Sequence, residues 1–177
     1  VSFGPALIPS FLLQPTNQTA TAGDTITLMA KVLGTEPLSL QWQQNGTNVA
    51  SATNETLTVK MQAANAGDYQ LVVTNLYGVA ASQTSVVTVI PSAPVFTVYP
   101  RSQGVPPGGT AYFTAAAKGT EPLAWQWFFE GNEILGATAP LLTISNITAA
   151  SRGRYTLTVS NSVGSNACVA EITFSSV

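Results

Sequence analysis

A pentapeptide that occurs twice limits what this chain can fold into. The sequence Gly-Thr-Glu-Pro-Leu occupies residues 34–38 and again residues 119–123, and each copy is followed four residues later by a tryptophan, Trp42 or Trp127. The 177 residues are enough for two small domains. The repeat therefore predicts one structural unit made twice along the chain.

The similarity between the two copies extends well beyond the pentapeptide. Residues 23–28 correspond to 108–113 on its N-terminal side, and residues 57–59 correspond to 142–144 on its C-terminal side. The segment at 66–78 corresponds to 152–164, where the spacing between copies has grown by one residue. We therefore expect a one-residue insertion in the second copy, ahead of this last segment.

Apolar residues alternate with their neighbours in most of the repeated segments. The pattern is clear around residues 26–30, 38–42, 57–59 and 69–73, where every second residue is apolar. A period of two with many β-branched residues predicts half-buried antiparallel strands. About seven such strands per copy, with a turn every eight to twelve residues, are typical of a sandwich of two β-sheets. The predicted fold class is all-β, with two β-sandwiches in tandem.

Turn and linker signals divide the chain. Asn75-x-x-Gly78 and Asn161-x-x-Gly164 predict hairpins in which the glycine supplies a positive φ. Between the copies, the two prolines of Ile90-Pro91-Ser92-Ala93-Pro94 favour a short, stiff connection. We expect domains at residues 9–91 and 92–177, preceded by an apolar arm or linker at residues 1–8.

The ordered landmarks resemble those of immunoglobulin-like domains, in particular the intermediate-set type found in modular surface proteins. The resemblance covers residues 9–177 and depends on a tryptophan in the third strand, a Gly-x-Tyr segment and an Asn-x-x-Gly hairpin, each present twice: Trp42, Gly67-Asp68-Tyr69, Asn75-x-x-Gly78, Trp127, Gly153-Arg154-Tyr155 and Asn161-x-x-Gly164. It implies that Trp42 and Trp127 are core residues. It also implies that the hydroxyls of Tyr69 and Tyr155 bond to the backbone.

The chain departs from that family pattern where a disulfide would join the sheets. The two cysteine positions hold Ala30 and Leu71 in the first copy, and Ala115 and Leu157 in the second. The single cysteine, Cys168, cannot close a bridge within the chain. Loss of such a bridge typically costs about 2–5 kcal/mol, which apolar burial has to supply instead.

A second departure concerns the acidic residue that members of the family carry two residues before the glycine of the Gly-x-Tyr segment. Asn65 and Ser151 stand there, so we do not expect the usual buried ion pair. Low charge, many threonines and no intersheet disulfide resemble the bacterial extracellular members of the family.

A few side chains outside the expected core are candidates for contacts with a partner. Phe128 follows an inward-pointing tryptophan, so it should point outward from its strand, and an exposed aromatic ring can anchor a protein or stack on a sugar. Tyr112 and Tyr77 should also be exposed, although isolated exposed apolar residues are common and need no function. Cys168 shares strand parity with Ala170 and Ile172 and is expected to be a small buried residue.

Composition excludes several classes of function. The chain has no histidine, which removes the common Ser–His and Cys–His arrangements, and its closest spaced acidic pair, Glu130 and Glu133, lies in a predicted turn. Only 8% of residues are charged, where about 25% is usual, and the net charge of −2 offers no basic surface for nucleic acid. No apolar run approaches the roughly 18 residues of a membrane span. We expect no catalysis, no cofactor, no metal and no membrane insertion.

The first eight residues, VSFGPALI, lie outside the repeat and are apolar, with Val1, Phe3, Leu7 and Ile8 as possible contact residues. They are either a linker from a preceding domain or an arm that adds a strand to a neighbouring copy. An arm of this kind would join copies head to tail into a filament.

From the sequence we predict a non-catalytic extracellular or cell-surface module, acting as a stiff spacer or as a protein–protein interaction unit. Its partners would be other protein domains or copies of itself. Two alternatives remain: a filament subunit that assembles through residues 1–8, and an accessory module of a secreted enzyme that contacts glycan.

Overall fold

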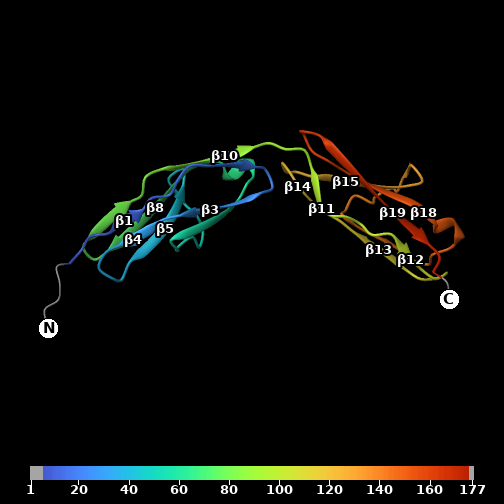
Figure 1. The fold of residues 1–177 in the computed structure, drawn as a ribbon, viewed down its shortest axis with the longest axis horizontal. Helices are drawn as coiled ribbons and strands as arrows, with labels where there is room; N and C mark the ends of the chain where they lie inside the picture. The colour runs from blue at the N-terminus through green and yellow to red at the C-terminus, as the bar shows by residue number, and fades with distance from the viewer. Residues whose placement is uncertain (1–5, 176–177) are drawn as a thin grey trace. The chain divides into compact units, whose positions relative to one another are not determined.

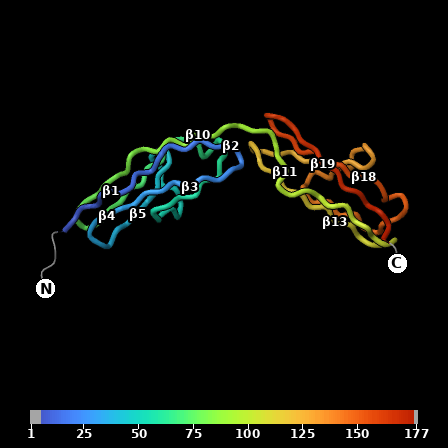
Figure 2. Tube along the Cα trace, viewed as in Figure 1, coloured from blue at the N-terminus to red at the C-terminus, as the bar shows by residue number. Residues whose placement is uncertain are grey.

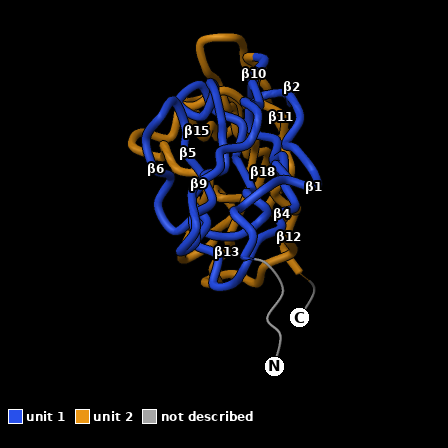
Figure 3. Tube along the Cα trace, turned by 90° about the vertical axis from the view of Figure 1, so that its left-hand side faces the viewer, with its two compact units in different colours: residues 1–90 blue, residues 91–177 orange. Residues whose placement is uncertain are grey.

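The computed structural model describes residues 6–175, and the predicted all-β class is confirmed (Figure 1). Contacts divide the chain into two compact units, Val1–Ile90 and Pro91–Val177 (Figure 3). Within residues 6–175 the helical segments are two single 3₁₀ turns, η1 (Ala63–Asn65) and η2 (Ala149–Ser151).

The first unit has two groups of strands around one core (Figure 2). The larger sheet has the order β2 (Gln18–Thr21), β10 (Ser85–Ile90), β8 (Gly67–Asn75), β5 (Ser39–Gln44) and β6 (Thr47–Asn48), and β9 (Gly78–Ala81) also pairs with β8. The other group pairs β1 (Ser10–Leu13) with β4 (Lys31–Leu33), and β3 (Thr25–Met29) with β7 (Thr56–Lys60). Among the strand pairs described in this unit, only that of β2 with β10 is parallel.

The second unit repeats this arrangement. Its larger sheet has the order β12 (Gln103–Gly104), β19 (Ser165–Thr173), β18 (Gly153–Ser160), β15 (Ala124–Phe129) and β16 (Asn132–Glu133). Two strand pairs complete this unit: β11 (Val95–Val98) pairs with β14 (Ala116–Lys118), and β13 (Ala111–Thr114) pairs with β17 (Leu141–Ile144). The strand that is divided into β9 and β10 in the first unit is continuous here as β19.

A fully buried tryptophan lies at the centre of each core. Trp42 of β5 and Trp127 of β15 are 0% exposed. The indole N–H of Trp42 donates to the Asn54 carbonyl at 2.9 Å, and that of Trp127 donates to the Ala139 carbonyl at 3.0 Å. Each unit therefore buries its largest side chain without leaving the indole donor unpaired.

Aliphatic side chains fill the places where the related domains have a disulfide. Ala30 and Leu71 are buried in the same core cluster as Trp42. In the second unit, Leu157 is buried and Ala115 packs against that core. Apolar burial thus joins the two sheets at these positions, as the substitutions predict.

Each unit also has a tyrosine whose hydroxyl bonds to the backbone four residues upstream. Tyr69 donates to the Asn65 carbonyl at 3.0 Å, and Tyr155 donates to the Ser151 carbonyl at 2.9 Å. Burial raises the pKa of Tyr69, while burial and the Glu130 carboxylate raise the pKa of Tyr155. Both hydroxyls therefore remain donors at neutral pH.

The inserted residue of the second copy lies just after β17. Met61 exchanges backbone hydrogen bonds with Gly23 and Asp24, and Ile147 does so with Gly108 and Gly109, so Met61 and Ile147 correspond. The extra residue therefore falls between Ile144 and Ile147. Asn146 takes a φ of 54° there, a conformation that asparagine tolerates better than most residues.

The hairpin glycines differ from the sequence prediction. Gly78 and Gly164 do not take the positive φ expected of them. A Cβ at Gly78 would lie 3.2 Å from Cγ2 of Ile8, and one at Gly164 would lie 3.1 Å from Cβ of Ala93. The close approach of a neighbouring segment therefore favours glycine at both positions. In the pentapeptides, which form the turns before β5 and β15, the Glu36–Pro37 and Glu121–Pro122 bonds are cis.

We predict that replacement of Leu71 by alanine lowers the free energy of unfolding by about 2–5 kcal/mol, because it leaves a cavity beside Trp42. Urea denaturation followed by tryptophan fluorescence measures this change. Leu12→Ala is the matched control, since Leu12 is 69% exposed and its loss should change the free energy by no more than about 0.5 kcal/mol. Equal effects of the two substitutions would contradict the role given to Leu71.

Candidate functional site

Three segments of the first unit are held together by the side chain of Asn75. Its amide nitrogen donates to the carbonyls of Leu7 and Thr35, both at 2.8 Å. Its carbonyl oxygen accepts from the backbone N–H groups of Tyr77 and Gly78. The hairpin between β8 and β9, the pentapeptide turn and the segment before β1 therefore meet at one place.

Large apolar side chains are exposed at this place. We call the set Leu7, Ile8, Leu76, Tyr77 and Val79 the apolar end, and the exposed fraction of these residues runs from 49% at Tyr77 to 87% at Leu76. Ile8 lies against Gly78, which brings the segment before β1 next to the hairpin. Clustered exposed apolar side chains mark surfaces that bind another molecule more often than isolated ones do.

The second unit builds the same frame with a different surface. Asn161 donates to the carbonyls of Ser92 and Thr120 at 2.8 Å, as Asn75 does to Leu7 and Thr35. The positions of the apolar end are held here by small or polar residues and one valine: Ser92, Ala93, Ser162, Val163 and Ser165. The hydrogen bonds made by Asn75 and Asn161 therefore do not require apolar side chains around them. The exposed apolar side chains of the first unit need a different explanation.

Leu7 and Ile8 differ from the arm expected at residues 1–8. The backbone N–H of Leu7 donates to the Thr35 hydroxyl at 2.8 Å, and its carbonyl accepts from the backbone N–H of Thr35. Ser92 makes the same two bonds with Thr120. Leu7 and Ser92 therefore hold corresponding places in the repeated unit. Val1 and Phe3, the other residues proposed for the arm, lie outside the described residues.

The remaining contact candidates are scattered. Phe128 on β15 is half-buried and lies in register with Glu133 of β16 and Thr156 of β18. Tyr112 on β13 is exposed, and Tyr77 belongs to the apolar end. Phe128 and Tyr112 belong to the second unit, whereas Leu7, Ile8 and Tyr77 belong to the first.

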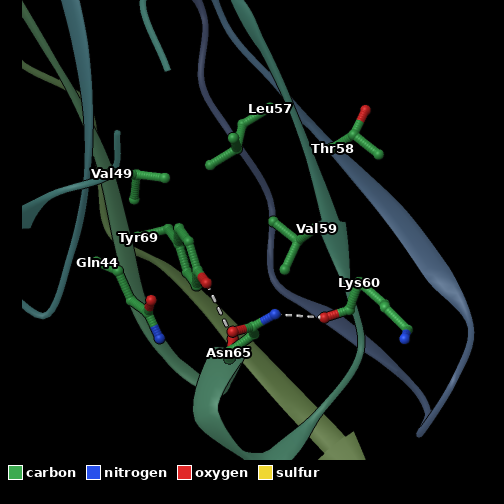
Figure 4. Close-up of a pocket in the computed structure, with 8 residues that line it drawn as sticks. All are labelled: Gln44, Val49, Leu57, Thr58, Val59, Lys60, Asn65 and Tyr69. Atoms are coloured by element: carbon green, nitrogen blue, oxygen red, sulfur yellow. Dashed lines mark hydrogen bonds between the residues drawn. The ribbon is translucent and has the colours of Figure 1, made fainter. Parts of the chain in front are cut away.

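Sequence reasoning did not find a pocket that opens between the sheets of the first unit. It has a volume of about 130 Å³ and is lined by Gln44, Val49, Leu57, Thr58, Val59, Lys60, Asn65 and Tyr69 (Figure 4). The Gln44 amide donates to the Ala64 and Ala66 carbonyls, and the Asn65 amide donates to the Lys60 carbonyl at 2.7 Å. The sequence difference that could have indicated this pocket is at Gln44, because the second copy has Phe129 at the corresponding position.

Reactive groups are not gathered at a site in the described part of the chain. Cys168 is half-buried against the second core, and burial raises the pKa of its thiol to about 11. Residues 6–175 contain no group of three or more His, Cys, Asp and Glu side chains able to hold a metal ion. Over the same residues, no helix has the length and apolar character that crossing a membrane would need.

Comparison with known proteins places these features in a family context. Residues 8–75 and 93–161 each match the model of the immunoglobulin domain. The human peroxidasin homolog is 26% identical over 97% of the chain, and the mouse basement membrane-specific heparan sulfate proteoglycan core protein is 27% identical over 93%. The chain spans only 12% and 5% of the lengths of these two relatives.

Solved structures show the same tandem fold. A chimeric titin Z1Z2 carrying an exogenous decorin peptide superposes with a TM-score of 0.53 at 22% identity, covering 98% of this chain and 100% of that one. A tandem pair of titin immunoglobulin domains gives a TM-score of 0.51 at 17% identity, with 97% and 100% covered. At these identities the likeness is one of fold.

We predict that Cys168 reacts slowly with iodoacetamide in the folded protein. Only the thiolate reacts, and raising the thiol pKa from 9.0 to about 11 lowers the thiolate fraction at pH 8 about a hundredfold. The rate should rise with pH until the pH passes about 11. The urea-unfolded chain is the control, and equal rates for the folded and unfolded protein at pH 8 would rule out protection by burial.

Proposed function

The chain belongs to the immunoglobulin domain family, and on this basis we propose that it is a non-catalytic protein-interaction module that acts outside the cell. The extracellular assignment is supported by a relative whose name places it in the basement membrane. It is also supported by a low content of charged residues, 8%. Two prolines in the connection between the units, Pro91 and Pro94, support an additional role as a stiff spacer.

The apolar end of the first unit is the observation that carries this proposal. Its five side chains are all apolar or aromatic, and removing such surface from water contributes about 25 cal/mol per Å². The same frame in the second unit is built with serine and alanine at most of these positions, so the apolar residues are not there to stabilise the fold. Binding another protein surface explains them.

A second copy of the chain is the partner that fits this surface best. In a twofold symmetric contact the same patch meets itself, so apolar side chains face apolar side chains. None of the five residues is charged, so no repulsion between like charges opposes the contact. The patch is small compared with standard interfaces, so we expect the association to be weak.

Strand addition that builds a filament is a second candidate, and an unpaired strand edge favours it. Within residues 6–175, β9 pairs with β8 along one side and with no strand along the other. The apolar residues 1–5 of another copy could add a strand there. The glycan-contacting alternative depends on Phe128, whose half-buried ring presents only part of its surface to a sugar, and we place it behind the other two.

Two finer assignments belong to the same proposal. The first strand of each unit is divided between the sheets, which supports the intermediate-set type. In the first unit β1 pairs with β4 and β2 with β10, and in the second unit β11 pairs with β14 and β12 with β19. Low charge and aliphatic residues in place of the disulfide support a bacterial surface protein, although the relatives described above are animal proteins.

We predict that the double substitution Leu76→Ser and Val79→Ser abolishes self-association, because it gives the apolar end two residues that the second unit has at the corresponding positions. Sedimentation velocity over roughly 10 µM to 1 mM covers the range of a small interface. Leu135→Ser is the matched control, since Leu135 in the second unit is 88% exposed and Leu76 is 87% exposed. A wild-type chain that stays monomeric throughout this range would contradict the proposed partner.

Removal of residues 1–5 tests the filament separately and leaves Leu7 and Ile8 in place. If residues 1–5 add a strand to β9 of another copy, negative-stain images should show fibres of the full chain and none of the shortened chain. Fibres that persist after the removal would exclude this segment as the joining strand. The shortened chain should retain the weak association through the apolar end.

A further inference from the structure

The second unit shows which group fits the corner between the sheets where the first unit has its pocket. Phe129 occupies the position of Gln44, and its ring centroid lies 4.8 Å from that of Tyr155, the counterpart of Tyr69. Phe113 occupies the position of Leu28, with its ring 5.3 Å from Tyr155 and 5.5 Å from Trp127. Two phenyl rings thus pack against the tyrosine in the second unit, whereas the first unit has a glutamine and a leucine.

The size of the pocket suits a single ring. Its volume is about 130 Å³, and an apolar cavity of about 150 Å³ is known to hold benzene. The ring of Tyr69 and the side chains of Val49, Leu57 and Val59 surround the space (Figure 4). These walls can contact a flat apolar guest on several sides.

Three polar side chains that line the pocket, those of Gln44, Asn65 and Tyr69, already donate hydrogen bonds within the protein, and the other two polar residues of the lining, Thr58 and Lys60, are exposed. The Gln44 amide donates to the carbonyls of Ala64 in the η1 turn and of Ala66 directly after it, and the Asn65 amide donates to the Lys60 carbonyl. The Tyr69 hydroxyl donates to the Asn65 carbonyl. A sugar or an ion would lose its water without gaining replacement hydrogen bonds from these donors, so the pocket favours an apolar guest.

We propose that this pocket binds one aromatic ring, presented by a phenylalanine side chain of a partner protein. The ring packs on Tyr69 as Phe129 packs on Tyr155 in the second unit. Gln44 leaves the space open and lies at its edge, bonded to the η1 turn. This site is separate from the apolar end, so each can fail its test while the other passes.

Methyl NMR with N-acetylphenylalanine amide as the probe tests the proposal on the full chain. The ring current should shift the methyl signals of Val49, Leu57 and Val59, with saturation at about 1–10 mM, a range suited to a single small ring. N-acetylalanine amide should cause no such shifts. The methyl groups of Leu142 and Ile144, which correspond to Leu57 and Val59 in the second unit, should not respond to either compound.

Gln44→Phe should weaken binding of the probe at least tenfold, because it supplies the missing ring from within the chain. Gln43→Phe is the matched control: it adds the same ring at the adjacent position of β5, where the second unit has Phe128, and should leave binding unchanged. Val49→Phe fills the pocket from another wall and replaces Gln44→Phe if that variant does not fold.

Three results would overturn the proposal. The first is the absence of saturable shifts in the wild-type chain at tens of millimolar probe, which would make the pocket a packing defect. The second is unchanged binding in a folded variant whose pocket has been filled. The third is an equal response to the alanine compound or an equal response of the second unit.

Discussion

The burial of one tryptophan in each unit is the constraint on which the rest of the structure depends. Trp42 and Trp127 have no exposed surface, and their indole N–H groups are paired with backbone carbonyls. No disulfide assists them, because Leu71 and Leu157 stand where a cysteine would be. Each sandwich therefore depends on the packing of its own core, and the turn before each tryptophan strand is repeated almost without change.

Much of the fold follows from features that are local in sequence. The alternation around Trp42 assigns its strand and its inward face, and the repeat carries this assignment to Trp127. Apolar alternation also places Leu71 in the core, because a period of two leaves a strand residue only two faces. The fold class and the tandem arrangement could be predicted for these reasons.

Features that depend on contacts between distant segments could not be predicted in this way. The role of Gly78 depends on Ile8, and the pocket depends on how far Gln44 reaches toward the η1 turn. Leu7 was assigned to an arm because residues 1–8 lie outside the repeat that the sequence shows, although Leu7 and Ser92 make the same two hydrogen bonds with a threonine. Sequence comparison detects shared side chains, whereas these positions share only the backbone geometry.

The inserted residue at Asn146 has a consequence for how the chain reaches its folded state. Two similar sandwiches joined by a short connection are at high local concentration during folding, and exchange of strands between such neighbours is a typical way for tandem domains to misfold. A segment running from β17 into β18 is one residue longer than its counterpart from β7 into β8. If it replaced that counterpart in the first unit, its extra residue would have to fit between the positions of Val59 and Met61, where the first unit has only Lys60. The two units therefore differ in the length of this connection, which favours the pairing of each unit's strands with one another.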